Sequence, residues 1–247
     1  MDQKVSEFLP DFQGLPEGET TIRDLLKMSS GINFDEHYVN PFAYPARANY
    51  GDDLVGLTMS YQQTEKPANT FSYLSGNTQL LSMIVREATG MSVSEYFSSR
   101  IWQPVGAKNT ALWSMDHEDG YEKAFCCFNS NALDFARIGK LYLQQGVWMG
   151  DTLIDPAYVM ESTHPVGMKE KDGSDCTRYG YQWWLTDFEG KPVFYARGIL
   201  GQYILVCPDM DLIVVRLGHK RIKPQGYEPP EEIEKYLKSA QRIISAK

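Results

Sequence analysis

Several features that define common classes of protein are missing from this chain of 247 residues. No stretch approaches the ~20 consecutive apolar residues that a membrane-spanning helix needs. The four cysteines show no C-x-x-C spacing, and the four histidines are scattered without an H-E-x-x-H pattern, so we expect no metal and no cofactor. Acidic residues outnumber basic ones by 32 to 24. The resulting negative field repels polyanions, so we expect no nucleic acid and no anionic membrane as a partner.

The remaining composition is that of an ordinary globular protein. Hydrophobic residues make up 43% of the chain and aromatic residues 13%, which at this length is enough to bury a substantial core. We expect a single domain over residues 1–247. Within it, residues 13–178 should form a mainly helical region, and residues 179–247 should form strands followed by one helix.

Capping signals and helical spacing mark most of the first region. Thr21 and Asp24 have the spacing of a capping box, which predicts a helix over Thr21–Met28. Residues Asn33–Lys66 show no sustained period, and we interpret them as a long, structured surface excursion. Similar signals predict further helices at Asn77–Thr89, from Ser92 towards Pro104, at Asn131–Gln145 and from Asp155.

From Tyr179 onward, the pattern changes to short strands rich in aromatic and β-branched residues. The turns between them are too short for a parallel crossover, so the sheet must be antiparallel. An amphipathic helix over Glu231–Ser245 can cover one face, which gives an α+β fold: an antiparallel sheet with a C-terminal helix, plus a mainly helical region. The predicted strands are Tyr181–Thr186, Pro192–Arg197, Gln202–Cys207 and Leu212–Leu217.

A first candidate for chemistry is the polar loop FSYLSGN, which precedes the helix expected from Asn77. Tyr73 could shuttle a proton there, with Ser75 or Asn77 forming hydrogen bonds beside it. Taken alone, the loop is more simply the N-cap region of the helix.

A second candidate is YARGILGQ, residues 195–202, where one strand turns into the next. Gly198 and Gly201 let a ligand approach the backbone closely, and the N–H groups of such an edge could bind a carbonyl oxygen as an oxyanion hole does. Taken alone, this segment is a glycine-containing hairpin.

A third motif places Cys126 directly before Cys127. Lys123 is the only basic residue close enough in sequence to lower a thiol pKa, so the motif predicts buried structural cysteines. A cysteine hydrolase that uses one of these thiols is therefore the least favoured function.

Taken in order, the motifs of this chain resemble those of the serine β-lactamase and penicillin-binding-protein-like hydrolases. The most similar branch is the class C-like group, which includes esterases and nylon-oligomer hydrolases. The resemblance extends over nearly the whole chain and implies a β-lactamase/transpeptidase-like fold. Its segments are Lys4–Phe12, Thr21–Gly31, the Tyr73–Asn77 loop with the helix that follows, Ser130–Gly139, Tyr179–Leu185 and Gly198–Pro208.

The resemblance also implies a mechanism. In this family, the serine of an S-x-x-K motif attacks an amide or ester carbonyl, and the lysine and a second-motif tyrosine manage the protons. By position, Tyr73 is that tyrosine, Ser75 stands where class C members often have asparagine, and the Ile199 N–H would donate to the oxyanion. These three residues are the expected catalytic set. The expected binding set, for a small-molecule amide, ester or peptide-like ligand, is Asn77, Arg197, Gly198, Gly201 and Gln202.

Two departures from the family pattern bear on this mechanism. The third motif usually begins with Lys or His, but Ala196 stands there, with Arg197 beside it as a partial replacement. No serine of the chain has lysine three positions later. In the family, that motif lies just upstream of the segment matching KVSEFLP, so we expect an N-terminally truncated member.

The missing lysine has a chemical consequence. Without a nearby positive charge, only about one in a thousand Tyr73 side chains would be ionised at pH 7. We therefore expect no hydrolase activity from this chain alone. The family strands that flank Leu212–Leu217 would also be missing, which predicts self-association through that edge. The alternative is a catalytically dead homologue that holds a ligand with Gly198–Gln202 and the Asn33–Lys66 excursion.

Overall fold

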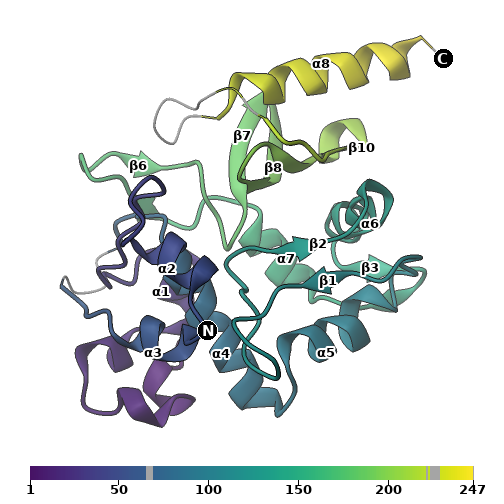
Figure 1. Cartoon of the computed structure of the whole chain (residues 1–247). Coiled ribbons are helices and arrows are strands. Elements are labelled where there is room, and N and C mark those ends of the chain that lie inside the picture. The colour runs from purple at the N-terminus through teal and green to yellow at the C-terminus, as the bar shows by residue number, and fades with distance from the viewer. Residues whose placement is uncertain (65–68, 221, 223–228, 247) are drawn as a thin grey trace. The chain divides into compact units, whose positions relative to one another are not determined.

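A computed structural model describes residues 1–64, 69–220, 222 and 229–246. The chain folds into two compact units, each assembled from segments that are far apart in sequence (Figure 1). The first unit comprises Met1–Gln103, Ala111–Asn129 and Gly167–Cys176. The second comprises Pro104–Thr110, Ser130–Val166 and Thr177–Lys247. No helix in the described part of the chain is long and apolar enough to cross a bilayer.

The first unit is mainly helical. Its helices are α1 (Ile22–Leu26), α2 (Tyr44–Tyr50), α3 (Leu54–Met59), α4 (Ser75–Thr89) and α5 (Val93–Phe97), the last continuing into a π-helical turn, η4 (Ser98–Trp102). Three 3-10 turns lie near the N-terminus, at η1 (Val5–Glu7), η2 (Pro10–Phe12) and η3 (Pro16–Glu19). Two short hairpins complete the unit: β1 (Leu112–Trp113) with β2 (Phe128–Asn129), and β5 (Met168–Lys169) with β6 (Asp175–Cys176).

The predicted capping signals are confirmed. Thr21 accepts from the Asp24 N–H, and the Asp24 side chain accepts in return from the backbone of Thr21. A second reciprocal box begins α5, and Gly90 ends α4 with a left-handed φ of 66° that favours glycine. Local side-chain chemistry therefore sets these helix ends.

The segment after Gly31 differs from the expected surface excursion. Its described part, residues 33–64, contains α2 and α3, and Tyr44 is fully buried, with its hydroxyl 2.9 Å from the Thr58 hydroxyl. Each helix is too short for an apolar period to be recognised in the sequence. The end of the predicted range at Lys66 lies outside the described residues.

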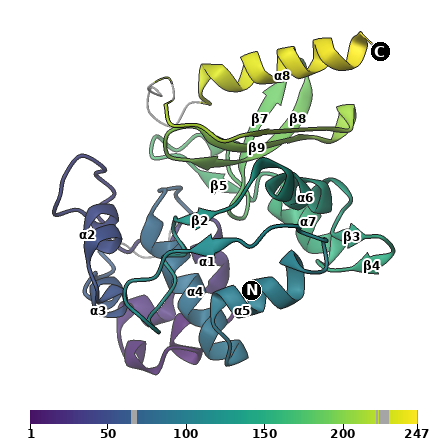
Figure 2. The same cartoon turned by 45° about the vertical axis from the view of Figure 1, so that its right-hand side comes forward.

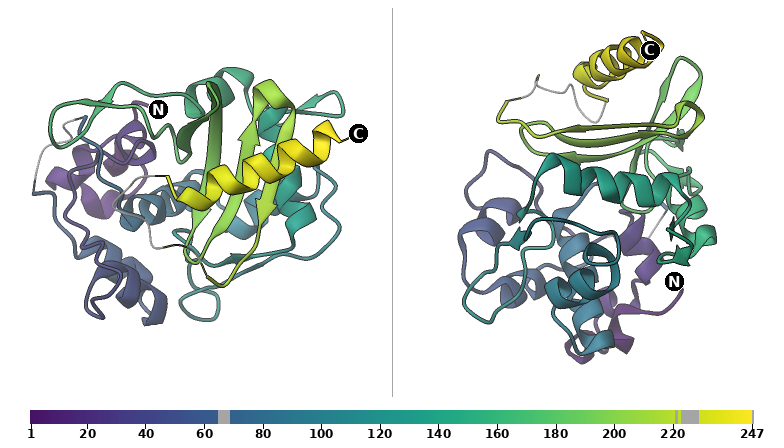
Figure 3. Two further views of the ribbon diagram at one scale, coloured as in Figure 1. Left: turned by 90° about the horizontal axis from the view of Figure 1, so that it is seen from above. Right: turned by 90° about the vertical axis from the view of Figure 1, so that its right-hand side faces the viewer.

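The second unit contains a four-stranded antiparallel sheet in the order β10-β9-β8-β7, which confirms the predicted sheet. The predicted helix over Glu231–Ser245, α8, crosses one face, and α6 (Ala132–Leu143) lies on the other (Figures 2 and 3). The strands are β7 (Trp184–Phe188), β8 (Lys191–Gly198), β9 (Gln202–Cys207) and β10 (Leu212–Arg216). Smaller elements are β3 (Val147–Trp148), β4 (Asp151–Thr152), α7 (Pro156–Ser162) and η5 (Pro208–Met210).

Alternate residues of β9 hold the two helices on opposite faces. Ile204 and Val206 join an apolar cluster with Trp183 and Phe194 on the face that carries α6. On the other face, the Tyr203 hydroxyl donates to Glu232 at the start of α8 over 3.0 Å. Strand β10 is an outer strand of the sheet, and among the described strands its second edge has no neighbour.

Candidate active site

The backbone before Tyr73 is held from two directions. Ser72 N–H donates to the carbonyl of Met28, and Phe71 N–H donates to the carbonyl of Lys169, both over 2.8 Å. Leu74 then has extended backbone (φ −140°, ψ 115°) as the N-cap of α4. Because of these contacts, the partly buried Tyr73 lies just before α4, which begins two residues earlier than the Asn77 start that the sequence predicts.

Ser75 is the first residue of α4 and is almost fully buried. Its backbone N–H donates to Glu36 Oε2 over 2.8 Å, and its hydroxyl donates to Glu36 Oε1. The Tyr38 hydroxyl also donates to Glu36 Oε1, over 2.7 Å. One carboxylate of the 33–64 segment therefore accepts three hydrogen bonds at the start of the second-motif helix.

Sequence reasoning missed Glu36 and Tyr38, which face Ser75 from a segment 37 to 39 residues earlier in the chain. One signal could have pointed to the carboxylate. The first turn of α4 contains no acidic residue, although the positive end of a helix dipole favours a negative charge there. Glu36 supplies that charge from another segment.

The two ionisable groups have pKa values displaced by their surroundings. Burial raises the pKa of Glu36 above its usual range, although the hydrogen bonds from Ser75 and Tyr38 oppose the shift. Burial of the hydroxyl and the nearby Glu36 and Tyr73 side chains also raise the pKa of Tyr38. The Tyr38 residue as a whole is 56% exposed, although its hydroxyl is engaged by Glu36.

Asn77, a predicted binding residue, is completely buried within the first unit. Its Oδ1 accepts from the Ser30 hydroxyl over 2.7 Å, and its Nδ2 lies 3.6 Å from the sulfur of Met28. These contacts give Asn77 a clear role in joining α4 to the segment after α1. Its contact with a ligand stays a prediction.

In the second unit, residues 199–201 form the loop between β8 and β9, after the last paired residues, Gly198 and Gln202. Ile199 is 59% exposed. Leu200 and Gly201 both have left-handed backbone, with φ of 62° and 85°. A Cβ atom at Gly198 would lie 2.8 Å from that of Gln202, so glycine is needed for the strands to come this close.

Gln202 joins this loop to the segment after β10, and Arg216 joins it to the end of β10 itself. The Gln202 side chain accepts from the Gly218 N–H over 2.9 Å, and its amide nitrogen donates to the Gly218 carbonyl. Arg216 donates to the carbonyls of Leu200 and Gly201. Both the oxygen and the nitrogen of the Gln202 side-chain amide are therefore engaged with the backbone of its own unit.

Ala196 and Arg197 point to opposite faces of β8. Ala196 packs against the apolar cluster on the α6 face. The Arg197 guanidinium lies 5.0 Å from the centre of the Trp184 ring, and its buried Nη1 has no hydrogen-bond partner among the described residues. Burial raises the pKa of neighbouring Tyr195 to about 12, and the charge of Arg197 opposes that rise.

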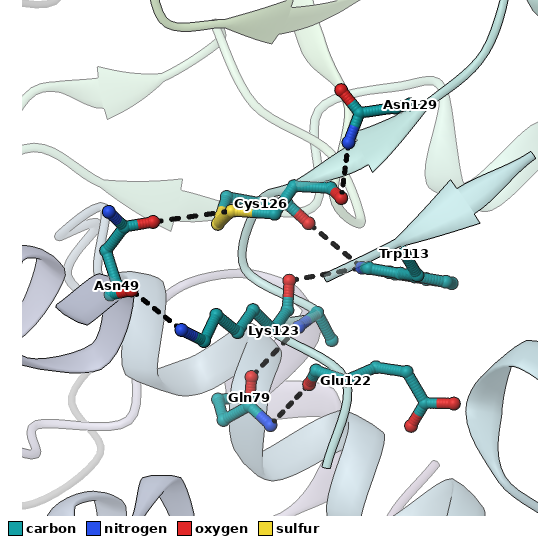
Figure 4. The surroundings of a disulfide bond; sticks show 9 residues. Asn49, Gln79, Trp113, Glu122, Lys123, Cys126 and Asn129 are labelled. Carbon is teal, nitrogen blue, oxygen red and sulfur yellow. Dashed lines mark hydrogen bonds between the residues drawn. A yellow bond between two sulfur atoms is a disulfide. The ribbon is translucent and has the colours of Figure 1, made fainter. Parts of the chain in front are cut away.

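Cys126 and Cys127 are only partly buried and form a disulfide between adjacent residues, whereas the sequence predicts buried structural cysteines (Figure 4). Gln79 of α4 holds this loop through hydrogen bonds to Glu122 and Ala124, each of 3.0 Å. Trp113 Nε1 donates to the carbonyl of Cys126 over 3.0 Å. With both sulfurs in the bond, neither can act as a thiolate nucleophile.

Two further observations concern binding sites elsewhere. A surface hollow of about 410 Å³ in the first unit is lined by Phe12, Met59 and Tyr61 among others, and by none of the predicted site residues. Over the described residues, no group of three or more His, Cys, Asp or Glu side chains could hold a metal ion.

Comparison with known proteins identifies the family. The sequence profile of the Beta-lactamase family matches residues 1–234. A 6-aminohexanoate-dimer hydrolase of Paenarthrobacter ureafaciens is 27% identical over 242 residues, covering 87% of this chain and 59% of that protein. A D-aminopeptidase of Cereibacter sphaeroides is 30% identical over 129 residues, covering 49% of this chain and 24% of that protein.

Solved structures show the same fold. A putative 6-aminohexanoate-dimer hydrolase from Bacillus anthracis has a TM-score of 0.80 at 22% identity, with 98% of this chain and 65% of that chain covered. A family VIII carboxylesterase has a TM-score of 0.72 at 15% identity, with 98% and 76% covered. The chain belongs to the beta-lactamase family, and it spans 59% and 65% of the two 6-aminohexanoate-dimer hydrolases.

Proposed function

We propose that this chain is part of a serine hydrolase that cleaves small amides, esters or peptide-like substrates through an acyl-enzyme. The observation that supports this most is the position of Tyr73, fixed directly before α4 in a chain of the beta-lactamase family. The similarity to proteins named 6-aminohexanoate-dimer hydrolase and D-aminopeptidase favours an amide as the substrate.

In this proposal, the hydroxyl of an S-x-x-K serine attacks the substrate carbonyl. Tyr73 takes the hydroxyl proton and returns a proton to the leaving amine or alcohol, so that the bond to carbon breaks as the acyl-enzyme forms. The Ile199 N–H donates to the oxyanion in the transition state. Ser75 and Asn77 hold the start of α4 in place, and Gly198, Gly201 and Gln202 shape the loop.

Arg197 would bind an anionic group of the substrate. Its buried Nη1 finds no acceptor in the part of the chain that the structure describes, which supports this role, because a carboxylate would supply a hydrogen-bond partner. Ala196 cannot supply the positive charge that Lys or His gives at this position in the family.

The sequence contains no serine with lysine three residues later, so we propose that the chain alone does not turn over substrate. The test compares the chain with a protein in which an S-x-x-K segment precedes it, using nitrocefin and p-nitrophenyl esters. We expect turnover only in the longer protein, lowered ~10²–10⁴-fold by Tyr73→Phe. Turnover by the chain alone that Tyr73→Phe abolishes would overturn this proposal.

A second candidate is a ligand-binding homologue without activity, which the replacement of the basic residue by Ala196 favours. Saturable binding of an amide or ester by a longer protein that never forms an acyl-enzyme would support this candidate. An acyl adduct found by mass spectrometry would exclude it.

We also propose self-association through the edge of β10 that has no neighbour among the described strands. An unpaired strand edge presents N–H and C=O groups to another chain, and a penicillin-binding protein homologue from Pyrococcus abyssi, with a TM-score of 0.68 at 21% identity, is described as octameric. Sedimentation equilibrium should show concentration-dependent assembly. A monomer at all concentrations would contradict the proposal.

A further inference from the structure

The carboxylate of Glu36 has an unusual position for an acidic side chain of a long connecting segment. It reaches the start of α4 and accepts from the backbone and the hydroxyl of the same residue, Ser75. A third donor, the Tyr38 hydroxyl, shares Oε1. An ionised carboxylate only accepts hydrogen bonds, so it suits a point where three donors converge.

We propose that Glu36 is a positioning residue for the second-motif tyrosine. The inference rests on the proposed function, because Tyr73 needs a fixed position only if it handles a proton. Ser75 lies two residues after Tyr73, and Glu36 holds both of its donors. The backbone contacts of Phe71 and Ser72 fix the residues that precede Tyr73. Glu36 therefore completes the support on the helix side of Tyr73.

The electrostatic surroundings agree with this geometry. The groups that face Glu36 from its own segment are Asp35, Tyr38 and Tyr44, and Ser75 faces it from α4. Tyr73 lies close enough to Tyr38 to disfavour ionisation of the Tyr38 phenol. Burial and the charge of Asp35 raise the pKa of Glu36, so its negative charge is lost on acidification earlier than that of an ordinary glutamate.

Protonation or replacement of Glu36 should therefore change the NMR signals of two groups, the Ser75 amide and the Tyr73 phenol. In the wild-type chain, the ¹⁵N–¹H signal of Ser75 should titrate at a pH above the usual range of glutamate. In Glu36→Gln, that titration should vanish and the ¹³Cζ signal of Tyr73 should move. The Gln side chain can still accept from the Ser75 N–H, so the fold is preserved while the charge is removed.

Two further variants separate position from charge. Glu36→Ala removes every acceptor, and exchange of the Ser75 amide hydrogen should accelerate at least ~10-fold, since hydrogen bonds to charged groups are worth about 1.5–3 kcal/mol. Asp35→Asn, the matched control, alters the adjacent carboxylate, which contacts His37 and Asn40. In this variant, the Ser75 signal should still titrate with Glu36 but at lower pH. The reason is that the negative charge of Asp35, which raises the pKa of Glu36, is removed.

Amide exchange within the interior turns of α4 shows whether each variant is folded. Ser75 and Tyr73 signals in Glu36→Gln that match the wild type at every pH would overturn the proposal. Because these signals are read on the chain itself, without turnover, failure of the hydrolase proposal would be seen separately, as a longer protein that forms no acyl-enzyme.

Discussion

Ser30 and Asn77 are joined by a hydrogen bond in the interior of the first unit. The Ser30 hydroxyl donates to Asn77 Oδ1 over 2.7 Å, and both side chains are fully buried. The two residues are 47 positions apart, so this contact ties the segment after α1 to the helix that follows Tyr73. The position of the second motif therefore depends on residues far from it in sequence.

Replacing Asn77 tests this link. Asn77→Ala leaves the Ser30 hydroxyl without its acceptor in a buried site, so the free energy of unfolding should fall by about 1–3 kcal/mol. Urea denaturation followed by tryptophan fluorescence measures this change. Thr89→Ala, at the exposed end of the same helix, is the control and should change stability by less than about 0.5 kcal/mol. Equal effects of the two substitutions would show that the buried link contributes little.

The stability of the second unit should depend on pH because of the buried carboxylate of Asp134. Burial alone would raise its pKa, but hydrogen bonds from Lys108, Asn109 and Asn131 lower it to about 2. Since the folded-state pKa lies below the unfolded value of 3.8, the stabilisation is fully present above pH ~4 and is lost as the pH falls towards 2.

The size of this effect should be about 2–2.5 kcal/mol. The matched variant is Asp134→Asn, which should be less stable than the wild type at pH 7, with a difference that shrinks below pH ~4. Thermal unfolding monitored between pH 7 and pH 2 gives the comparison. A constant difference over this range would contradict the assignment of the pKa to Asp134.

Gly139 sets how closely α6 approaches the sheet. A Cβ atom there would lie 3.0 Å from the Ile204 Cγ2 atom and 3.1 Å from that of Ile213. Gly139→Leu should therefore lower the free energy of unfolding by about 1–3 kcal/mol through overpacking. Gly139→Ala should cost much less, because its gain in helix propensity of ~1 kcal/mol offsets the tighter contact. Equal stabilities of the two variants would show that α6 can move away from the sheet.

The disulfide between Cys126 and Cys127 determines how many free thiols the protein should contain. Protein purified in air without reductant and then unfolded should show two thiols, those of Cys176 and Cys207, and four after reduction. Cys126→Ser releases its former partner, Cys127, and should show three thiols without reductant. Four thiols in the unreduced wild-type protein would mean that Cys126 and Cys127 are not joined.

Features determined by neighbouring residues could be predicted from the sequence. The bounds of β9 and α8 follow from turn residues at their ends and from a regular apolar period, and the capping boxes of α1 and α5 from residues three apart. The family could be predicted from the order of its motifs, and the Beta-lactamase profile confirms it.

Features that depend on contacts between distant residues could not be predicted from the sequence. Glu36 meets Ser75 across 39 positions, and no local pattern marks that contact. Helices α2 and α3 have seven and six residues, too few for a period to stand out. The sequence also placed Asn77 in the binding set because of its motif. Its complete burial against Ser30 follows only from the packing of α4.

The central claim is that Tyr73 and the loop after Gly198 act on one substrate. The most direct test is paramagnetic broadening. A nitroxide attached at position 199 through Ile199→Cys should broaden the ¹³Cζ signal of Tyr73, assigned with Tyr73→Phe, and reduction of the nitroxide should restore it. Broadening of Tyr73 well beyond that of exposed Tyr50 is the result that the account predicts. A Tyr73 signal that the nitroxide leaves sharp would contradict it.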